Sequence, residues 1–319
     1  AKVLQMAQQF RDDLTDPANR DTTNYLPAAQ QLYQWLVAPL AGELQARKVE
    51  NIAFIMDEGL RSLPIAALHN GRQFLVEQYS LGIMPSLSLT ETLYQGLKRS
   101  EVLAMGASEF RDQKPLPAVP VELSAIQAGW AGQSFLNEAF TLRNLEVQRQ
   151  KQPFEIIHLA THAEFQPGSP DNSYIQLWDQ KLRLTELPEL GWNDPPVQLL
   201  VLSSCRTALG DRQAELGFAG VAYQAGVKSV LASLWAVDDE GTLALMTEFY
   251  QRLKTAPIKA EALRQAQLAM IRGQVRVDEG MLESSNESVP LPPELAESGV
   301  KDLSHPYYWS AFTMIGSPW

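Results

Sequence analysis

The sequence predicts an α/β protein built on a mostly parallel sheet. Short runs that are apolar throughout alternate with longer stretches in which apolar residues recur every three or four positions. Strands that are apolar on both faces belong to a sheet that helices cover on both sides. A length of 319 residues suits one large domain or two smaller ones.

The first 50 residues are predicted to be helical. Between Pro27 and Lys48, leucines recur once per helical turn, at Leu32, Leu36, Leu40 and Leu44. Pro39 should interrupt this helix, because proline cannot donate the helical hydrogen bond. The runs 51–56 and 74–84 are then predicted as strands. We expect residues 1–99 to form an N-terminal accessory part.

A regular alternation begins at about residue 100 and predicts a second part over residues 100–319. Its strand-like runs are Val102–Gly106, Ser134–Leu136, Ile156–Ala160, Leu199–Ser203, Ser229–Ser233 and Ala311–Ile315. Helical patterns lie between them, at 121–130, 141–149, 216–225, 240–254 and 259–272. The segment 111–120 holds three prolines and is predicted as a loop.

The segment 273–303 differs in composition from the rest of this part. It has no aromatic residue, three prolines and an excess of acidic residues. Such a segment buries little apolar surface, so we expect a flexible insertion or a lid.

Composition excludes several classes of function. With a net charge of −11 and a pI near 4.9, the chain is expected to bind neither a nucleic-acid backbone nor an anionic membrane surface. A single cysteine excludes an internal disulfide and a thiolate-rich zinc site, and we expect no metal and no cofactor. No apolar run reaches the roughly 18 residues of a membrane-spanning helix, and no signal peptide is evident. A cytoplasmic location is the default expectation, although the missing initiator Met suggests a processed chain or a fragment of a longer protein.

Two predicted strands end in residues that can do chemistry. One strand runs into His162, and the next long strand runs into Cys205 and Arg206. Ligands of open α/β sheets bind beyond the carboxyl ends of strands, so a thiol and an imidazole there form a candidate nucleophile and acid/base pair. The simpler alternative is that a lone cysteine is a small buried hydrophobic residue.

The pair His158 and His162 also invites a metal-binding hypothesis. On a strand, however, residues four apart are separated by about 13 Å, which is too far for one ion. We therefore interpret His158 as a core residue. By position, His69 is expected to be exposed in a turn, and His305 to pack near the last strand.

Two acids, Asp238 and Asp239, follow the strand at 229–233 and open a helix. Acids at a helix N-terminus cap free N–H groups, which is one explanation for both. The other is that one of them lines a substrate pocket, because it also lies beyond the carboxyl end of a strand.

Taken together, several segments resemble the CHAT domain, a caspase-like relative of separase. They are HLATH (158–162), VLSSCRTALGD (201–211), ELGFAG (215–220), QAGVKSVLASLWAVDDEGTLALM (224–246), EALRQAQLAM (261–270) and HPYYWSAFTMIG (305–316). The N-terminal segments APLAGEL (38–44), MDEGLRSLPIAAL (56–68) and MPSLSL (84–89) fit the same family, so the resemblance covers nearly the whole chain.

The resemblance implies a caspase-like, six-stranded sheet and a cysteine endopeptidase. By the match of these motifs to the family, Cys205 would be the nucleophile and His162 the catalytic histidine. Backbone N–H groups of Ala163 and Cys205 would form the oxyanion hole, and Asp239 would bind a basic P1 side chain, with Asp238 as the fallback. Expected partners are a protein or peptide substrate and a regulatory domain or protein outside this chain.

Two positions depart from the family pattern. Ala163 stands where many relatives have glycine, and Arg206 stands where many have an acid. Arg206 could lower the pKa of the thiol, but it could also oppose a basic P1 residue. The family's usual protein-interaction repeats are absent from this chain.

Two rival functions remain. A protease-like signalling or interaction module would keep the fold with little turnover, although the presence of both His162 and Cys205 weighs against it. A nucleotide-binding domain is disfavoured, because no glycine-rich phosphate loop follows a strand.

Overall fold

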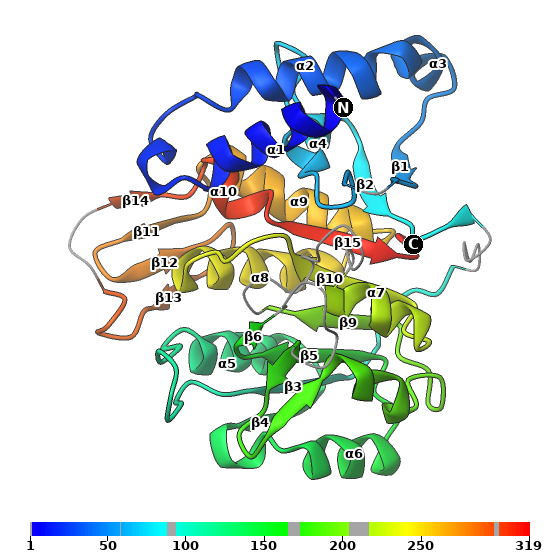
Figure 1. Cartoon of the computed structure of the whole chain (residues 1–319). Coiled ribbons are helices and arrows are strands. Elements are labelled where there is room, and N and C mark those ends of the chain that lie inside the picture. Colours follow the sequence, from blue (N-terminus) through cyan, green and yellow to red (C-terminus); the bar gives the residue numbers. More distant parts are fainter. Residues whose placement is uncertain (1, 58, 88–93, 165–172, 204–216, 297–299) are drawn as a thin grey trace.

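The computed structural model describes residues 2–57, 59–87, 94–164, 173–203, 217–296 and 300–319. Its centre is an eight-stranded sheet in the order β1-β2-β15-β10-β9-β5-β3-β4 (Figure 1). In that order the strands are Asn51–Phe54, Ser80–Ile83, Phe312–Gly316, Ser229–Ser233, Leu199–Leu202, Ile156–Ala160, Val102–Gly106 and Gly132–Leu136. The mixed α/β class is confirmed, and so are all six strands predicted after residue 100.

The sheet is parallel except at one place, where β10 and β15 pair antiparallel. The predicted number of six strands is too small, because β1 and β2 of the N-terminal part extend the same sheet. Ile83 of β2 pairs with Ile315 of β15. The apolar edge of β15 is thereby covered by a strand from the other end of the chain.

The α-helices of the described residues are α1 (Lys2–Thr15), α2 (Leu26–Leu36), α3 (Ala41–Ala46), α4 (Leu75–Gln78), α5 (Val119–Gly129), α6 (Leu142–Lys151), α7 (Gly217–Gln224), α8 (Asp239–Leu253), α9 (Lys259–Ile271) and α10 (Pro306–Trp309). The helices include those predicted along the chain, whereas α4 and α10 lie where no helix was predicted. As predicted, Pro39 interrupts the N-terminal helix, in a short 3-10 turn between α2 and α3.

One predicted strand is partly wrong. The run 74–84 begins with the short helix α4, and only its second half forms β2. The Glu77 carboxylate accepts a hydrogen bond of 2.6 Å from the backbone N–H of Phe74. This cap stabilises a helical turn within an otherwise strand-like apolar run.

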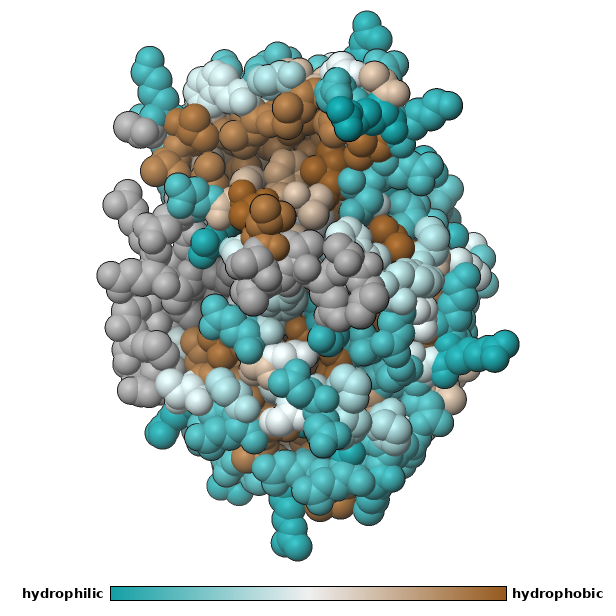
Figure 2. All heavy atoms as spheres, turned by 90° about the vertical axis from the view of Figure 1, so that its right-hand side faces the viewer, coloured by the Kyte–Doolittle hydropathy of each residue, from teal (hydrophilic) through white to brown (hydrophobic). Residues whose placement is uncertain are grey.

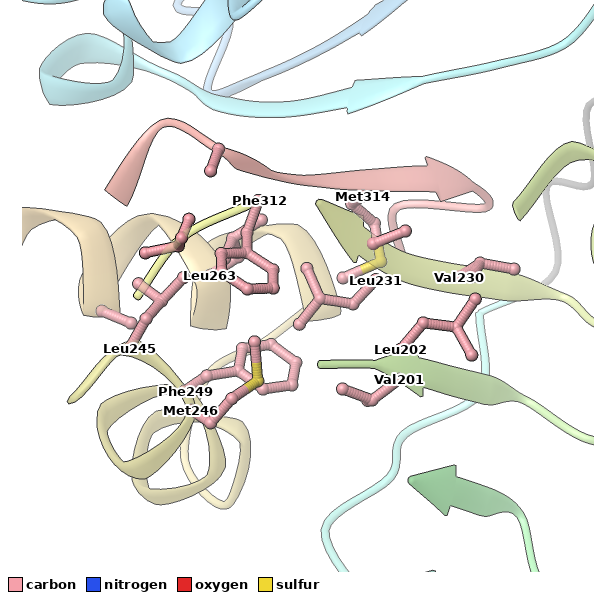
Figure 3. Close-up of a cluster of buried hydrophobic side chains, with 14 of the residues drawn as sticks. Val201, Leu202, Val230, Leu231, Leu245, Met246, Phe249, Leu263, Phe312 and Met314 are labelled. Carbon is pink, nitrogen blue, oxygen red and sulfur yellow. The ribbon is translucent and has the colours of Figure 1, made fainter. Parts of the chain in front are cut away.

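Two groups of helices cover the sheet. α5, α8 and α9 pack side by side in one layer, and α6 and α7 both contact the turn at Leu184–Leu190 (Figure 1). Figure 3 shows α8 and α9 directing Met246, Phe249 and Leu263 toward the strands. There they meet Leu231 and Phe312, and all of these side chains are at most 3% exposed. This apolar contact fixes where α8 begins relative to the strand ends.

The described residues of the segment 273–303 include a second, four-stranded sheet, so the segment contains regular structure, while its flexibility and a role as a lid stay predictions. The strands of this sheet are β11 (Arg276–Asp278), β12 (Met281–Glu283), β13 (Ser288–Pro290) and β14 (Val300–Asp302), in the order β13-β12-β11-β14. We call it the small sheet. Glu279 and Gly280 both have positive φ angles, of 47° and 77°, as a two-residue hairpin requires. Val277 and Leu282 are at most 3% exposed, so the small sheet has an apolar face despite its acidic composition.

A third, three-stranded sheet lies next to the carboxyl end of β5. It consists of β6 (Ala163–Glu164), β7 (Tyr174–Gln176) and β8 (Lys181–Arg183). The backbone N–H of Gln176 donates to the carbonyl of His162 over 2.8 Å. The chain that leaves β5 is thereby held in place.

Figure 2 shows one face, with an apolar area over the N-terminal part and mainly hydrophilic residues below it. Among the described residues, no helix has both the length and the apolar character needed to cross a membrane.

Candidate active site

The two strands that lead into the predicted dyad are neighbours in the sheet. β5 and β9 pair in parallel, from Ile156 with Leu199 to Leu159 with Leu202. Their carboxyl ends therefore lie at the same edge of the sheet. His162 follows β5 by two residues, whereas Cys205 and Arg206 lie outside the described residues, as do all positions from 204 to 216.

A loop that follows β3 holds the His162 ring. Its Nε2 lies 2.7 Å from the carbonyl oxygen of Lys114, and the ring of Phe110 packs against it at 4.6 Å between centroids. A carbonyl can only accept, so Nε2 of His162 carries the proton. Nδ1 is then the nitrogen that can exchange a proton with a substrate or a thiol.

Ala163 begins β6 and pairs with Ile175 of β7. Among the described residues other than glycine, positive φ angles occur at Lys48, Asn137 and Glu279, and Ala163 is not one of them. Alanine thus fits this position without backbone strain.

Asp239 lies close to both strand ends. It lines a cavity together with Thr161 and Ser203, which directly follow β5 and β9. The cavity measures about 20 Å³, which is room for about one water molecule. Asp239 is therefore adjacent to the chain segments that carry the predicted dyad, in a space closed to a large side chain.

The environment of Asp239 favours its neutral form. Its pKa is raised to about 6, chiefly by burial; a hydrogen bond from the backbone of Ala118 works in the opposite direction, and the negative charges of Glu240, Glu122 and Asp238 contribute to the rise. A carboxyl group that changes charge near neutral pH beside two strand ends has the character of a functional group.

Asp238 has a structural role. It is the N-cap of α8, where Oδ1 accepts the backbone N–H of Gly241 over 2.9 Å. Its other oxygen, Oδ2, lies 2.9 Å from Nζ of Lys301. Capping thus explains Asp238, and Asp239 lies one position further on, in the first turn of α8.

His158 is a core residue, as predicted, and it belongs to a buried polar network. The side chain is fully buried, with Nε2 lying 3.0 Å from Oε1 of Glu122 and Nδ1 lying 3.1 Å from the Tyr250 hydroxyl. The Ser203 hydroxyl lies 3.4 Å from Nε2. Sequence reasoning missed Glu122, although a signal exists: it shares one helical stripe with the apolar Val119, Leu123 and Ile126.

The other two histidines lie apart from the strand ends. His69 is half-buried against Phe74 rather than exposed in its turn. His305 caps α10 and contacts the ring of Tyr25, which agrees with the predicted packing role.

A larger cavity, which sequence analysis did not predict, is lined by Phe110, the residue whose ring packs against His162. It measures about 890 Å³ and is also lined by Gln113, Glu164, Tyr174 and Trp178, among others. Tyr174 donates its hydroxyl proton to Glu164 over 2.9 Å, and Nζ of Lys181 lies 3.8 Å from the Tyr174 ring centroid. This aromatic and acidic cavity is large enough for substrate side chains.

Within the part of the chain that the structure describes, no three His, Cys, Asp or Glu side chains gather as a metal site would require. What the described site offers is an oriented imidazole, a buried acid and a cavity, all at one sheet edge. These groups suit acid/base chemistry and the binding of a polar side chain.

Comparison with known proteins agrees with the resemblance read from the motifs. The family model of the CHAT domain matches residues 26–317. No curated protein matches. Two structures of the Saccharomyces cerevisiae separase–securin complex match at 12% identity, with TM-scores of 0.53 and 0.54, over 98% and 99% of this chain. This chain spans 20% and 22% of the length of those separase-complex chains.

A complex of the pro- and mature domains of Porphyromonas gingivalis RgpB also matches. Its TM-score is 0.51 at 12% identity, over 99% of this chain and 75% of that one. Likenesses at this identity show the fold, which is that of caspase-like cysteine peptidases.

Proposed function

Because the chain belongs to the CHAT domain family, we propose that it is a cysteine endopeptidase that hydrolyses peptide bonds in a protein substrate. One observation carries the proposal. β5 and β9 are parallel neighbours, and beyond β5 the His162 ring is oriented by the Lys114 carbonyl with its Nδ1 left for proton exchange. Cys205 follows β9 by three residues.

The proposed reaction uses the Cys205 and His162 side chains as a dyad. Nδ1 of His162 takes the proton of the Cys205 thiol, and the resulting thiolate attacks the peptide carbonyl. As the peptide C–N bond breaks and the thioester forms, Nδ1 passes that proton to the leaving amine. Water then hydrolyses the thioester with His162 as the base. In this proposal the N–H groups of Ala163 and Cys205 stabilise the oxyanion, and the cation of Arg206 lowers the pKa of the thiol.

We further propose a preference for Arg or Lys at P1, with Asp239 as the binding residue. An ionised carboxylate in a partly dry site forms a charge-assisted pair with a guanidinium. Asp239 is better suited than Asp238, since both oxygens of Asp238 are already used by the helix cap and Lys301. The cavity of about 20 Å³ must widen before a basic side chain can enter.

The accessory role of residues 1–99 and the boundary at residue 100 stay predictions. β1 and β2 lie in the same sheet as the strands of the second part. We propose that the first part supports the peptidase fold rather than acting alone.

The same small cavity favours a second candidate function, a protease-like interaction module with little turnover. A site with room for about one water holds no substrate side chain in this state. A protein partner that opens the site would reconcile the two functions. Securin in the matched complexes is a protein bound to separase, and a partner of this chain is likewise part of the proposal.

Matched peptides with Arg, Ala or Asp at P1 test the proposal. Asp239→Asn keeps the shape of the side chain and removes its charge, so cleavage of the Arg peptide should fall by about two to four decades in kcat/KM. Cleavage of the Ala peptide is the control and should change little. Unchanged Arg cleavage in the variant, or a preference of the wild type for Asp at P1, would mean that Arg206 rather than Asp239 governs the pocket.

A further inference from the structure

Lys301 of the small sheet reaches the first turn of α8. Its Nζ lies 2.9 Å from Oδ2 of Asp238 and 3.3 Å from Oε2 of Glu240. These two acids are the chain neighbours of Asp239 on either side. The Lys301 ammonium group therefore forms an ion pair with each of these two acids, and Asp239 lies between them in the sequence.

This lysine differs from an ordinary surface lysine. Its side chain is 30% exposed, and Nζ lies 5.8 Å from the ring centroid of Tyr308. Burial alone would lower the pKa of Lys301, but the charge of Asp238, its hydrogen bond and the charge of Glu240 raise it above the usual value. The side chain is therefore charged throughout the neutral range.

The small sheet is attached to α8 at a second place, which fixes its position along the helix. The backbone N–H of Ser285 donates to Glu248 over 2.6 Å. Gln251 donates to Glu287 over 2.7 Å and accepts from Asn286 over 2.8 Å. Since α8 is held at both its first turn and its later turns, Lys301 is presented to Asp238 and Glu240 by a docked element.

We propose that Lys301 is a positioning residue of the site around Asp239: it pairs Asp238 and Glu240, so that Asp239 is the carboxylate left to receive a basic side chain. The substrate part of this inference rests on the proposed function. It gives the segment 273–303 a role in specificity, through a side chain that acts by way of Asp238 and Glu240.

The charges around Asp239 explain how this works. Asp238 and Glu240 adjoin it on its own helix, Glu122 faces it from α5, and the backbone of Ala118 donates a hydrogen bond to it. Without Lys301, the charges of Asp238 and Glu240 are no longer balanced by an adjacent cation. Asp239 then keeps its proton to higher pH, and its ionised fraction near neutral pH falls.

The first test needs no substrate. The titration of the Asp239 carboxyl carbon, followed by NMR, is compared in wild type, Lys301→Met and Lys301→Arg. We expect the Asp239 pKa to rise by about one unit in Lys301→Met, the size of a nearby charge effect, and to return toward wild type in Lys301→Arg. Should Lys301→Met fail to fold, Lys301→Gln serves as the second neutral variant.

Two control variants distinguish the effect of the Lys301 charge from the effect of attaching the small sheet to α8. Arg276→Met removes a cation of the same sheet that is 49% exposed and lies 3.8 Å from Asp278. Gln251→Ala weakens the second attachment and leaves Lys301 in place. Neither should shift the Asp239 titration. A shift in Gln251→Ala equal to that in Lys301→Met would show that docking matters rather than the charge of Lys301, and the inference would be wrong.

The second test uses the Arg and Ala peptides. If the pKa of Asp239 rises from about 6 to about 7, its ionised fraction falls about twofold at pH 7 and about fivefold at pH 6. Lys301→Met should therefore lower the Arg/Ala ratio of kcat/KM by about these factors, mainly through KM, and the ratio should recover at higher pH. An unshifted Asp239 titration in folded Lys301→Met overturns the inference whatever the peptides show. If no form of the protein cleaves either peptide, the proposed function fails, while the titration still decides what Lys301 does to Asp239.

Discussion

Asp239 changes charge at an unusually high pH for an aspartate, about 6, chiefly because it is buried. In the proposed function only its ionised form binds a basic P1 residue. The Arg/Ala ratio of kcat/KM should therefore rise as the pH passes through about 6, from about pH 5 to about pH 7, and then level off. The ratio cancels the titrations of Cys205 and His162, which both peptides share.

Asp239→Asn is the control for this pH profile, since the amide does not titrate. Its Arg/Ala ratio should be flat over the same range. A flat ratio in the wild type as well would remove Asp239 from P1 recognition.

Much of the candidate site could be predicted from residue order alone. His162 and the acids at 238 and 239 each follow an apolar strand, and the pattern of strands and helices brings parallel strand ends to one edge. The contacts that tune these residues could not be predicted. Lys114 lies 48 residues before His162, and Lys301 lies 63 residues after Asp238, so only the folded chain brings them together.

At the scale of elements, long helices and strands were predictable and short strands were not. The strands of the small sheet have three residues each, too few for an alternation of apolar and polar residues to be recognised. Asp278-Glu279-Gly280 contains a hairpin turn, but its acidic surroundings suggested a solvated loop instead. The acidic composition of the segment reflects the exposed face of the small sheet, and the few buried apolar residues of its other face could not be recognised from it.

We predict that the buried apolar residues of the small sheet contribute to the stability of the protein. Leu282 is fully buried, so Leu282→Ala should lower the free energy of unfolding by about 2–5 kcal/mol, as measured in urea. Val300→Ala removes apolar atoms from the same sheet at a position that is 67% exposed, and it should change little. Equal effects of the two substitutions would mean that the sheet contributes no core.

At the scale of the whole molecule, the two predicted parts share one sheet. β2 pairs with β15, and Arg264 of α9 donates hydrogen bonds to the carbonyls of Val76 and Glu77 over 2.8 and 2.7 Å. Sequence reasoning separated residues 1–99 from the rest because their patterns differ. It could not detect the shared sheet, because pairing between distant strands leaves no local pattern.

We therefore expect the chain to unfold in one transition, and the fragment 100–319 to be unstable alone, since it would expose the edge of β15. Calorimetry of the full chain and circular dichroism of the fragment measure this. Two separate transitions, or a stably folded fragment, would show that residues 1–99 form an independent domain.

The central claim is that Cys205 is the nucleophile of a peptidase with His162 as its partner. A peptidyl arginyl ketone that alkylates active-site thiols tests it directly, with the labelled residue identified by mass spectrometry. We predict stoichiometric labelling of Cys205 in the native protein, much slower labelling in His162→Ala, and none in Cys205→Ala or after denaturation. Equal labelling rates in native wild type and His162→Ala, or no labelling of the native protein, would contradict the account.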